Sequence, residues 1–178
     1  MVQIRPMDQA DLAAVMAVQV ACYPPHFHEP LVTLSARLQA CPQTAWVATW
    51  AGQVCGYVVG YRSRYGCVAP LGSGFIDHPS ADCGYLHDLA ILPNMTGQGV
   101  AAQLLAACWT SMQADRLSYS ALVSVQDSQR FWQRYGYQPT LLPTEGARLA
   151  LSSYGEGAVY MVKALADMSI DLNACIES

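Results

Sequence analysis

The sequence is poor in charge. Asp, Glu, Lys and Arg make up 12% of its 178 residues, whereas about 25% is usual in a soluble domain. Nine basic residues against thirteen acidic ones give a net charge of −4, and the basic residues are scattered singly, which argues against a nucleic-acid partner. No apolar run reaches the roughly 18 residues of a membrane span, and residues 1–12 carry acids where a signal peptide has basic and apolar residues. We therefore expect a cytoplasmic protein that binds neither nucleic acid nor membranes.

Paired cysteine motifs are also absent. The chain has seven cysteines, an odd number, and no two of them are spaced as C-x-x-C. This pattern is typical of neither a disulfide scaffold nor a zinc site, so we expect free and mostly buried thiols. A surface this poor in charge leaves room for an apolar patch used in self-association, so a homodimer stays an open alternative.

Hydrophobic residues, in contrast, make up 53% of the chain, enough for one sizeable core. We expect a single domain over residues 1–165 and an acidic tail over residues 166–178. Periodicity and turn residues predict strands at residues 3–5, 44–50, 53–62, 85–91, 119–125, 137–142 and 158–165. They predict helices at residues 8–22, 31–40, from 100 onward and 128–135, with Asp8 and Asp127 as N-caps.

The order of these elements is β-α-α-β-β-β-α-β-α-β-β. It predicts a mixed α/β sheet in which a central strand, a glycine turn and a helix form half of a βαβ unit. The apolar face of that helix consists of Val100, Leu104, Leu105, Cys108 and Met112. Residues 63–83 form a long loop rich in Gly, Pro and Ser, and residues 149–157 a connection; long loops in compact domains are usually functional or poorly ordered.

The glycine turn is the first candidate binding site. Its residues are Thr96, Gly97, Gln98, Gly99, Val100 and Ala101. Amides at a helix start lack helical partners and carry the positive end of the helix dipole, and glycines let an anionic ligand approach them closely. The turn is neither a P-loop, because no Gly-Lys-Ser/Thr follows, nor a dinucleotide motif, because Gln103 occupies the position of its third glycine. A tight turn without any ligand is the alternative.

The wider pattern resembles a known family. The segments LHDLAILPNMTGQGVAAQLL and QRFWQRYGYQP are similar to the acetyl-CoA-binding core of the GNAT acyltransferase superfamily, and the resemblance extends over about residues 2–165. The segments LQACPQTAWVA, VCGYVVGY and YLHDLAILP are most similar to its arylalkylamine N-acetyltransferase-like branch. The resemblance implies the GNAT fold, acetyl-CoA as cosubstrate, no metal, and transfer to an amine without a covalent enzyme intermediate.

The resemblance also implies which residues hold the cofactor. The family pattern Gln/Arg-x-x-Gly-x-Gly/Ala falls on residues 96–101, where Gly99 and Ala101 match and Thr96 replaces the usual Gln or Arg. The amides of this turn would hold the pyrophosphate, and main-chain groups of Leu89, Ala90 and Ile91 would pair with the pantetheine arm. Ser128 and Trp132 are further candidate cofactor contacts.

Acetyl transfer to an amine requires loss of a proton from the nitrogen and a donor near the carbonyl oxygen. His87 is the main catalytic candidate, since an imidazole suits a base near neutrality. The related branch has His-x-His on this strand, and here Tyr85 replaces the first histidine. Strand alternation predicts that Tyr85, His87 and Leu89 share one face and that Asp88 lies on the opposite face, paired or structural. A hydrogen-bonded strand histidine without a catalytic part is the alternative for His87.

The usual acid position of the family is occupied by Trp132, whose indole N–H donates a hydrogen bond but is not a useful acid. A proton could come from Tyr135 or Tyr85, the thiolate could leave as an anion, or catalysis could be lost. On the proline-rich loop, His26 to Glu29 have no second cluster that would complete a metal site. Phe27, His28 and Glu29 are instead candidates for the acceptor site, where a carboxylate favours a cationic amine.

Three hypotheses follow. The first is an acetyl-CoA-dependent N-acetyltransferase acting on a small amine, arylalkylamine- or polyamine-like. The second is an acyl-CoA-binding or sensing module without turnover, favoured by Trp132. The third is an interaction domain that retains only the fold, favoured by Thr96.

Overall fold

The computed structural model describes residues 1–75 and 78–165. The expected acidic tail, residues 166–178, lies outside the described residues. The strands are β1 (Gln3–Pro6), β2 (Ala45–Trp50), β3 (Gln53–Ser63), β4 (Cys83–Ile91), β5 (Tyr119–Ser124), β6 (Gln138–Pro139) and β7 (Val159–Ala164). Besides short 3-10 helices, the chain has the α-helices α1 (Leu12–Cys22), α2 (Leu31–Ala40), α3 (Val100–Ala114), α4 (Gln129–Arg134) and α5 (Glu145–Ser152).

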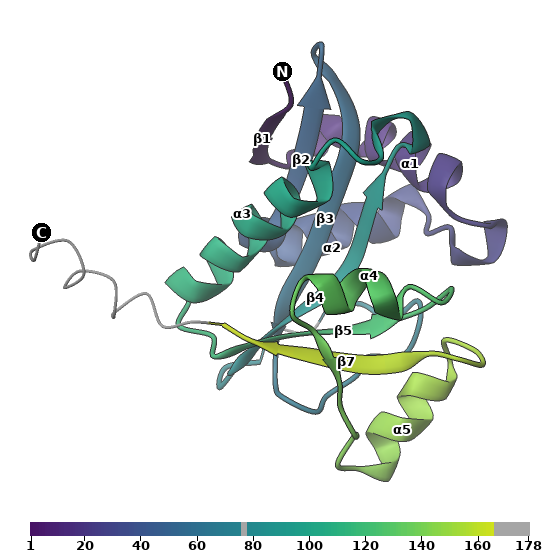
Figure 1. Cartoon of the computed structure of the whole chain (residues 1–178), viewed down its shortest axis with the longest axis vertical. Helices are drawn as coiled ribbons and strands as arrows, with labels where there is room; N and C mark the ends of the chain where they lie inside the picture. The colour runs from purple at the N-terminus through teal and green to yellow at the C-terminus, as the bar shows by residue number, and fades with distance from the viewer. Residues whose placement is uncertain (76–77, 166–178) are drawn as a thin grey trace, which may run out of the picture.

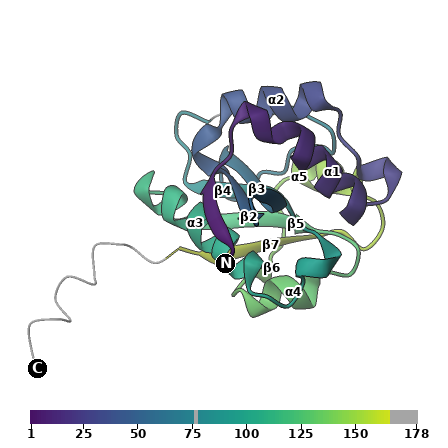
Figure 2. The ribbon, with the colours of Figure 1, turned by 90° about the horizontal axis from the view of Figure 1, so that it is seen from above.

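The strands form one mixed sheet in the order β1-β2-β3-β4-β5-β7-β6 (Figure 1). Every neighbouring pair is antiparallel except β4 and β5, which are parallel and connected through α3. Helices α1 and α2 lie on one face of the sheet, and α3 and α4 lie on the other (Figure 2). The mixed α/β sheet predicted from the sequence is therefore confirmed.

Both faces of the sheet are covered by side chains that the periodicity of the helices places there. On α3 the five residues of the predicted apolar face, Val100 to Met112, are each at most 1% exposed, and they pack on β3, β4 and β5. On the other face, Leu12, Val15 and Val18 of α1 pack with Tyr57 and Ala90. The Asp8 side chain accepts from the amide of Ala10, and the Asp11 side chain accepts from the amide of Asp8, so the expected cap at this helix start is present.

Two local predictions are wrong. The expected connection, residues 149–157, begins inside helix α5, which Thr144 caps by accepting a hydrogen bond from the amide of Ala147 at 3.1 Å. The N-cap of α4 is Ser128, and Asp127 has a left-handed backbone with φ of 55°. Asp127 therefore cannot hold the extended conformation that a capping residue usually adopts.

The long loop between β3 and β4 is attached at several points where the structure describes it. The amide of Gly66 donates to the hydroxyl of Tyr160 at 3.0 Å, and the amide of Leu71 donates to Ser153 Oγ at 2.9 Å. The Tyr154 hydroxyl donates to the carbonyl of Ala69 at 2.8 Å. The residues following α5 thus hold this loop against the domain.

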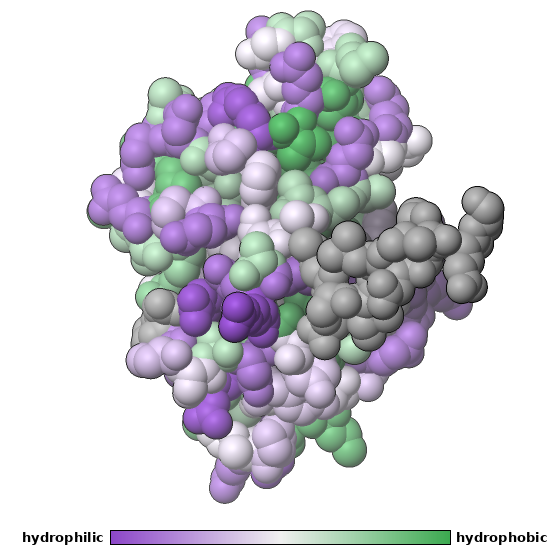
Figure 3. All heavy atoms as spheres, turned by 90° about the vertical axis from the view of Figure 1, so that its left-hand side faces the viewer, coloured by the Kyte–Doolittle hydropathy of each residue, from purple (hydrophilic) through white to green (hydrophobic). Residues whose placement is uncertain are grey.

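The surface mixes polar and apolar side chains. On the face drawn in Figure 3, apolar areas are scattered among polar ones rather than joined into one broad patch. Among the residues described, no helix is long and apolar enough to cross a membrane. The six described cysteines are free, and four of them are buried: Cys41, Cys55, Cys83 and Cys108.

Candidate active site

The central feature of the site is a cavity of about 350 Å³ where β4 and β5 separate. The two strands pair only from Cys83 with Tyr119 to Leu86 with Leu122. Beyond that point their carboxyl ends diverge, which is visible in Figure 1. The cavity touches residues of β4, β5 and α4, the loop before α2 and the turn before α3. It opens along an edge of β4 that has no strand partner.

The glycine turn lies at the start of α3, beside this edge. Gly97 and Gly99 have φ of 80° and 73°, a left-handed backbone that favours glycine. A Cβ added at either glycine would meet no atom within 4 Å, so the space in front of the turn is open. The Gln98 side chain folds back and donates to the carbonyl of Asn94 at 3.1 Å. The turn therefore presents exposed backbone, with the first amides of α3 lacking helical partners.

Only some of the residues expected to form the cofactor site line the cavity. Thr96, Leu89 and Ile91 line it, and so do Ser128 and Trp132. The side chain of Val100 is buried in the core, so only its backbone faces the turn, and Ala101 follows it in the first helical turn.

Two main-chain carbonyls near the end of β4, those of Leu89 and Ile91, accept hydrogen bonds from side chains at the end of α1. The carbonyl of Leu89 accepts from the Tyr23 hydroxyl at 2.9 Å, and the carbonyl of Ile91 accepts from the Cys22 thiol at 3.2 Å. Ala90 is buried beside Tyr57 of β3, on the side covered by α1. Leu89 and Ile91 are therefore the members of this trio that border the cavity.

A bulge in the pairing of β3 and β4 determines the orientation of the catalytic candidate. Val59 pairs with Asp88 and Gly60 pairs with Leu86, so His87 has no partner on β3. A Cβ at Gly60 would lie 2.7 Å from the carbonyl oxygen of Tyr85, so the close approach of the strands here requires glycine. The extra residue interrupts the alternation of side chains along β4.

The bulge corrects two expectations. His87 and Asp88 lie on the same side of the sheet, the side of α1 and α2, because His87 contacts Arg37 of α2 and Asp88 contacts Tyr23 at the end of α1. Leu89 packs on the opposite side, in the cluster around α3. The prediction that Asp88 faces away from His87, and that Leu89 shares the face of His87, is therefore wrong.

His87 belongs to a buried cluster with Glu29 and Arg37. Arg37 Nη1 lies 2.9 Å from His87 Nε2 and donates to Glu29 Oε2, which is itself 3.3 Å from His87 Nε2. The side chains of Arg37, His87 and Glu29 are 3%, 9% and 12% exposed. Burial alone would raise the pKa of Glu29, but hydrogen bonding and charge from the protonated form of His87 and from Arg37 outweigh it and lower this pKa to about 2. Glu29 is thus an ionised carboxylate at neutral pH.

Asp88 has hydrogen-bond partners, as expected, and these partners are two tyrosines. It accepts from the Tyr23 hydroxyl at 2.5 Å and from the Tyr57 hydroxyl. Burial raises the pKa of the Asp88 carboxyl, and the two tyrosine hydrogen bonds only partly oppose this effect. Asp88 therefore lines the cavity as a carboxyl group whose oxygens both have donors.

Tyr85 lies behind the cavity rather than in its wall. It is 1% exposed, and its ring lies tilted against that of Tyr61, with ring centroids 5.0 Å apart. Burial raises the pKa of Tyr85 well above 10, with a further contribution from Tyr154. The structure places Tyr85 on the face of His87 but among core residues.

The candidate acceptor residues divide into two groups. Phe27 and Glu29 line the cavity. His28 does not, because its Nε2 lies 2.6 Å from the carbonyl of Tyr23 and so fixes the proline-rich loop. Among the residues that the structure describes, no group of three or more His, Cys, Asp or Glu is placed to hold a metal ion.

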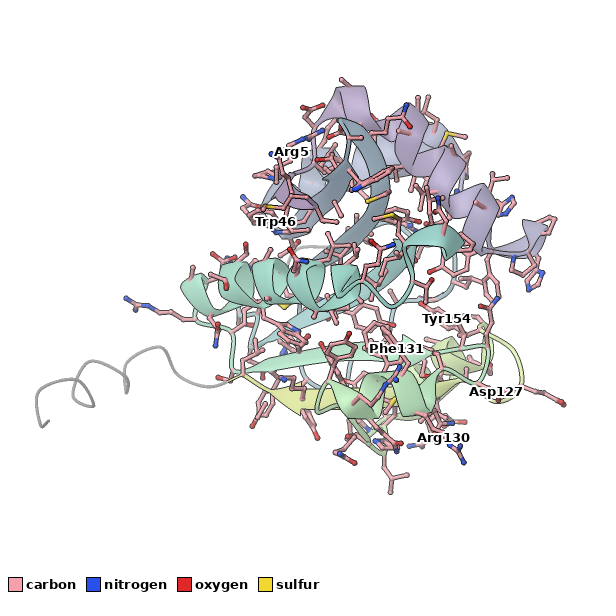
Figure 4. All side chains as sticks on the ribbon, turned by 45° about the horizontal axis from the view of Figure 1, so that its top comes forward. Arg5, Trp46, Asp127, Arg130, Phe131 and Tyr154 are labelled. Carbon is pink, nitrogen blue, oxygen red and sulfur yellow. The ribbon has the colours of Figure 1, made fainter. Side chains whose placement is uncertain are left out.

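On the opposite wall, Trp132 contacts Phe131 and Tyr137 edge to face, with ring centroids 4.9 and 5.6 Å apart. Phe131 on α4 and Tyr154 after α5, both labelled in Figure 4, also line the cavity. Tyr135 instead packs against Trp109 and Phe131 and is not part of this wall.

Sequence reasoning missed Arg37 and Tyr154, and it gave Tyr23 no role beyond being one of the aromatic loop residues that suit an aromatic acceptor. Arg37 offered a signal, since it follows Leu34 by three residues and precedes Leu38 on the buried face of a correctly predicted helix. A lone cation on an apolar face requires a partner when it is buried. Tyr154 follows α5, which was not predicted, and Tyr23 offered no signal beyond its place in the loop.

Comparison with known proteins identifies the family. The model of the acetyltransferase (GNAT) family matches residues 12–137. The match covers more than half of the chain, and the chain belongs to this family. A comparison with curated proteins finds no match.

Solved structures share the fold. The loading GNATL domain of CurA from Lyngbya majuscula has a TM-score of 0.74 at 15% identity, over 93% of this chain and 98% of that chain. The GphF GNAT-like decarboxylase in complex with isobutyryl-CoA has a TM-score of 0.71 at 19% identity, over 92% of this chain and 100% of that one. The ribosomal-protein-S18-alanine N-acetyltransferase from Escherichia coli has a TM-score of 0.65 at 14% identity, over 97% and 99%. Identities this low show the fold alone.

Proposed function

We propose that the chain transfers an acetyl group from acetyl-CoA to a primary amine of a small molecule. The observation that carries the proposal is the single cavity that touches Thr96 at the glycine turn, Leu89 and Ile91 on the open edge of β4, and His87 and Glu29 at the bulge. A cofactor arm and an acceptor would meet beside His87. The GNAT family match and the CoA complex of a structural neighbour support the choice of cosubstrate.

The residues present fit CoA. The open space before Gly97 and Gly99, together with the dipole of α3, suits a pyrophosphate. The edge of β4 at Leu89 and Ile91 has no strand partner and can pair with an extended arm. Thr96 replaces the usual Gln or Arg, so binding rests on backbone amides, while Ser128 and Trp132 would close the site from α4. Such an arm would run from the turn along β4 and end at the bulge.

When bound, acetyl-CoA supplies the acetyl group: the amine nitrogen forms a bond to the carbonyl carbon, the carbon–sulfur bond breaks, CoA leaves as a thiolate, and the surplus proton of the nitrogen passes to solvent. In this site His87 is a residue of the chain that can exchange a proton or a hydrogen bond with the reacting atoms. Trp132 can donate a hydrogen bond but supplies no proton to the thiolate.

The wall at the acceptor end favours a compact amine with an apolar or aromatic body. Phe27, Tyr23 and Tyr154 supply aromatic surface, and the ionised Glu29 supplies negative charge beside them. Arg37 neutralises part of that charge, which disfavours a highly charged polyamine. An arylalkylamine is therefore the class we propose first, with a peptide amino terminus as the competing acceptor.

The second candidate function is an acyl-CoA-binding module without turnover. Trp132 at the usual acid position favours it, because its indole N–H supplies no proton to the leaving thiolate. Both functions require the glycine turn, so cofactor binding alone does not separate them.

The test is a thiol-release assay with acetyl-CoA and a panel of arylalkylamines, polyamines and short peptides. Acetyl-CoA binding is followed by calorimetry on the same sample. Release with one amine class supports the transferase and identifies its acceptor. Binding without release across the panel supports the binding module, and absence of binding contradicts both functions.

A further inference from the structure

The Nε2 atom of His87 is occupied by two neighbours, Arg37 and Glu29. It lies 2.9 Å from Arg37 Nη1 and 3.3 Å from Glu29 Oε2. His87 nevertheless lines the cavity. The ring nitrogen left for a molecule in the cavity is therefore Nδ1.

The partner of Nε2 determines where the imidazole proton lies. A guanidinium has only N–H donors, so Arg37 can only donate. Its Nη1 carries two hydrogens, which suffices to donate to Glu29 Oε2 and to His87 Nε2 at once. If Nε2 accepts, the proton of a neutral imidazole must be on Nδ1.

The opposite tautomer would have His87 donate from Nε2 to Glu29. That contact is 3.3 Å, longer than the usual N–H···O distance of about 2.9–3.0 Å. It would also turn an N–H of His87 toward the N–H of Arg37, a fixed cation at 2.9 Å. Both features favour the proton on Nδ1 when the imidazole is neutral.

The cluster is rigidly held. The backbone of Glu29 is bound on both sides by the buried Gln19, whose amide donates to the carbonyl of Glu29 at 3.0 Å and accepts from its N–H at 3.1 Å. Arg37 Nη2 donates to the carbonyl of Ser73 at 2.7 Å, and its guanidinium lies 4.8 Å from the ring centroid of Phe75. Arg37 does not line the cavity, so it acts through His87 rather than on a substrate.

We propose that Arg37 is a positioning residue that fixes His87 as the Nδ1–H tautomer, and that His87 presents this N–H to the cavity as a hydrogen-bond donor to the acyl oxygen. The proposal rests on the proposed acyl transfer. It replaces the expected role of His87 as a base, because a nitrogen that carries the proton cannot accept one. The amine must then react as its uncharged form, and its surplus proton passes to solvent.

The tautomer can be read without any turnover. Long-range proton–nitrogen correlation spectra of the ¹⁵N-labelled full chain distinguish a protonated ring nitrogen from an accepting one. The chain has four histidines, and the spectrum of His87→Ala identifies the signals of His87. In the neutral imidazole we expect Nδ1 protonated and Nε2 accepting. A neutral imidazole with its proton on Nε2 in the wild-type protein would overturn the proposal.

Arg37→Met tests the positioning role in the same spectra. Without the guanidinium, Nε2 can donate to Glu29, so the Nδ1–H tautomer should lose its predominance. An unchanged tautomer in the folded variant would show that Arg37 does not set it. If Arg37→Met does not fold, Arg37→Lys provides the second test, because its ammonium keeps a donor and should keep the wild-type tautomer.

The donor role has its own readout. Acetyl-CoA should shift the Nδ1–H proton resonance of His87, whereas CoA without an acyl group should not. Equal effects of the two ligands would overturn the donor role. Failure of acetyl-CoA to bind in calorimetry would instead contradict the proposed function, and the tautomer measurement would stand apart from it.

A matched pair of variants extends the test to catalysis. Asn at position 87 carries an N–H near the place of Nδ1 but is not a base, and Ala carries neither. We expect His87→Ala to lower kcat about 10²–10³-fold, as loss of a donor to a developing oxyanion does. His87→Asn should retain most of the wild-type kcat. Equal losses of kcat in the two variants would overturn the donor role and support His87 as a general base.

Discussion

The buried carboxylate of Glu29, which contacts His87 and Arg37, should contribute measurably to stability, and Glu29→Gln tests this. The pKa of Glu29 falls from 4.5 to about 2 on folding. A difference of about 2.5 pKa units, at about 1.4 kcal/mol per unit, corresponds to about 3.5 kcal/mol at neutral pH. Removing one partner of a buried pair typically costs about 3–5 kcal/mol, because the other charge stays buried without compensation. Both routes predict that Glu29→Gln lowers the free energy of unfolding by about 3–4 kcal/mol at pH 7.

The sign of the pH dependence provides a second check. A carboxyl whose pKa is lowered in the folded state stabilises the protein above its unfolded pKa, and this stabilisation is lost as pH falls from 4.5 toward 2. Urea unfolding of wild type and Glu29→Gln should therefore show a difference that is largest near pH 7 and shrinks below pH 4.5. Glu156→Gln, at an exposed position, is the matched control and should leave stability nearly unchanged. A difference for Glu29→Gln that stays constant from pH 7 to pH 3.5 would refute the reasoning.

Three further substitutions test other parts of the site. Gly99→Val should abolish acetyl-CoA binding in calorimetry while costing only about 1–2 kcal/mol of stability for its left-handed backbone; undiminished affinity would mean that the turn holds no ligand. Gly60→Ala should destabilise the domain by about 1–3 kcal/mol in urea unfolding, because its Cβ would lie 2.7 Å from the carbonyl oxygen of Tyr85; an unchanged midpoint would argue against the close approach at the bulge. Trp132→Tyr should raise kcat about 10²-fold if the missing acid limits thiol release, and an unchanged kcat would show that the thiolate leaves without an acid.

Local patterns predicted much of the fold. The bounds of α2 and the buried face of α3 were predicted as observed, because helical periodicity depends only on nearby residues. Helix α5 was missed although its residues are amphipathic, because it is only eight residues long and Ala147 is its one buried residue. The cap at Thr144 was the available signal. Surrounding Ser and Gly residues favoured the interpretation as a connection.

The site was harder to predict than the fold. Strand alternation placed Asp88 opposite His87, and a bulge reversed this, because a bulge depends on how two strands pair and not on either strand alone. The contact of Arg37 with His87 joins residues 50 positions apart. Glu29 was singled out as a group for the substrate, whereas its contacts with Arg37 and His87 depend on the tertiary structure.

The position of the cavity and its chemistry have different origins. In an otherwise antiparallel sheet, β4 and β5 form the parallel pair, and α3 connects them. Ligands of open α/β sheets bind outside the carboxyl ends of such strands, close to a helix start. The topology alone therefore places a cavity beside the glycine turn in any chain with this fold. What the site can do depends on the bulge, because it brings His87 to the point where the strands separate and turns its Nε2 toward Arg37. The same fold with another residue at position 37 would offer a histidine of different tautomer at the same place, and hence different chemistry.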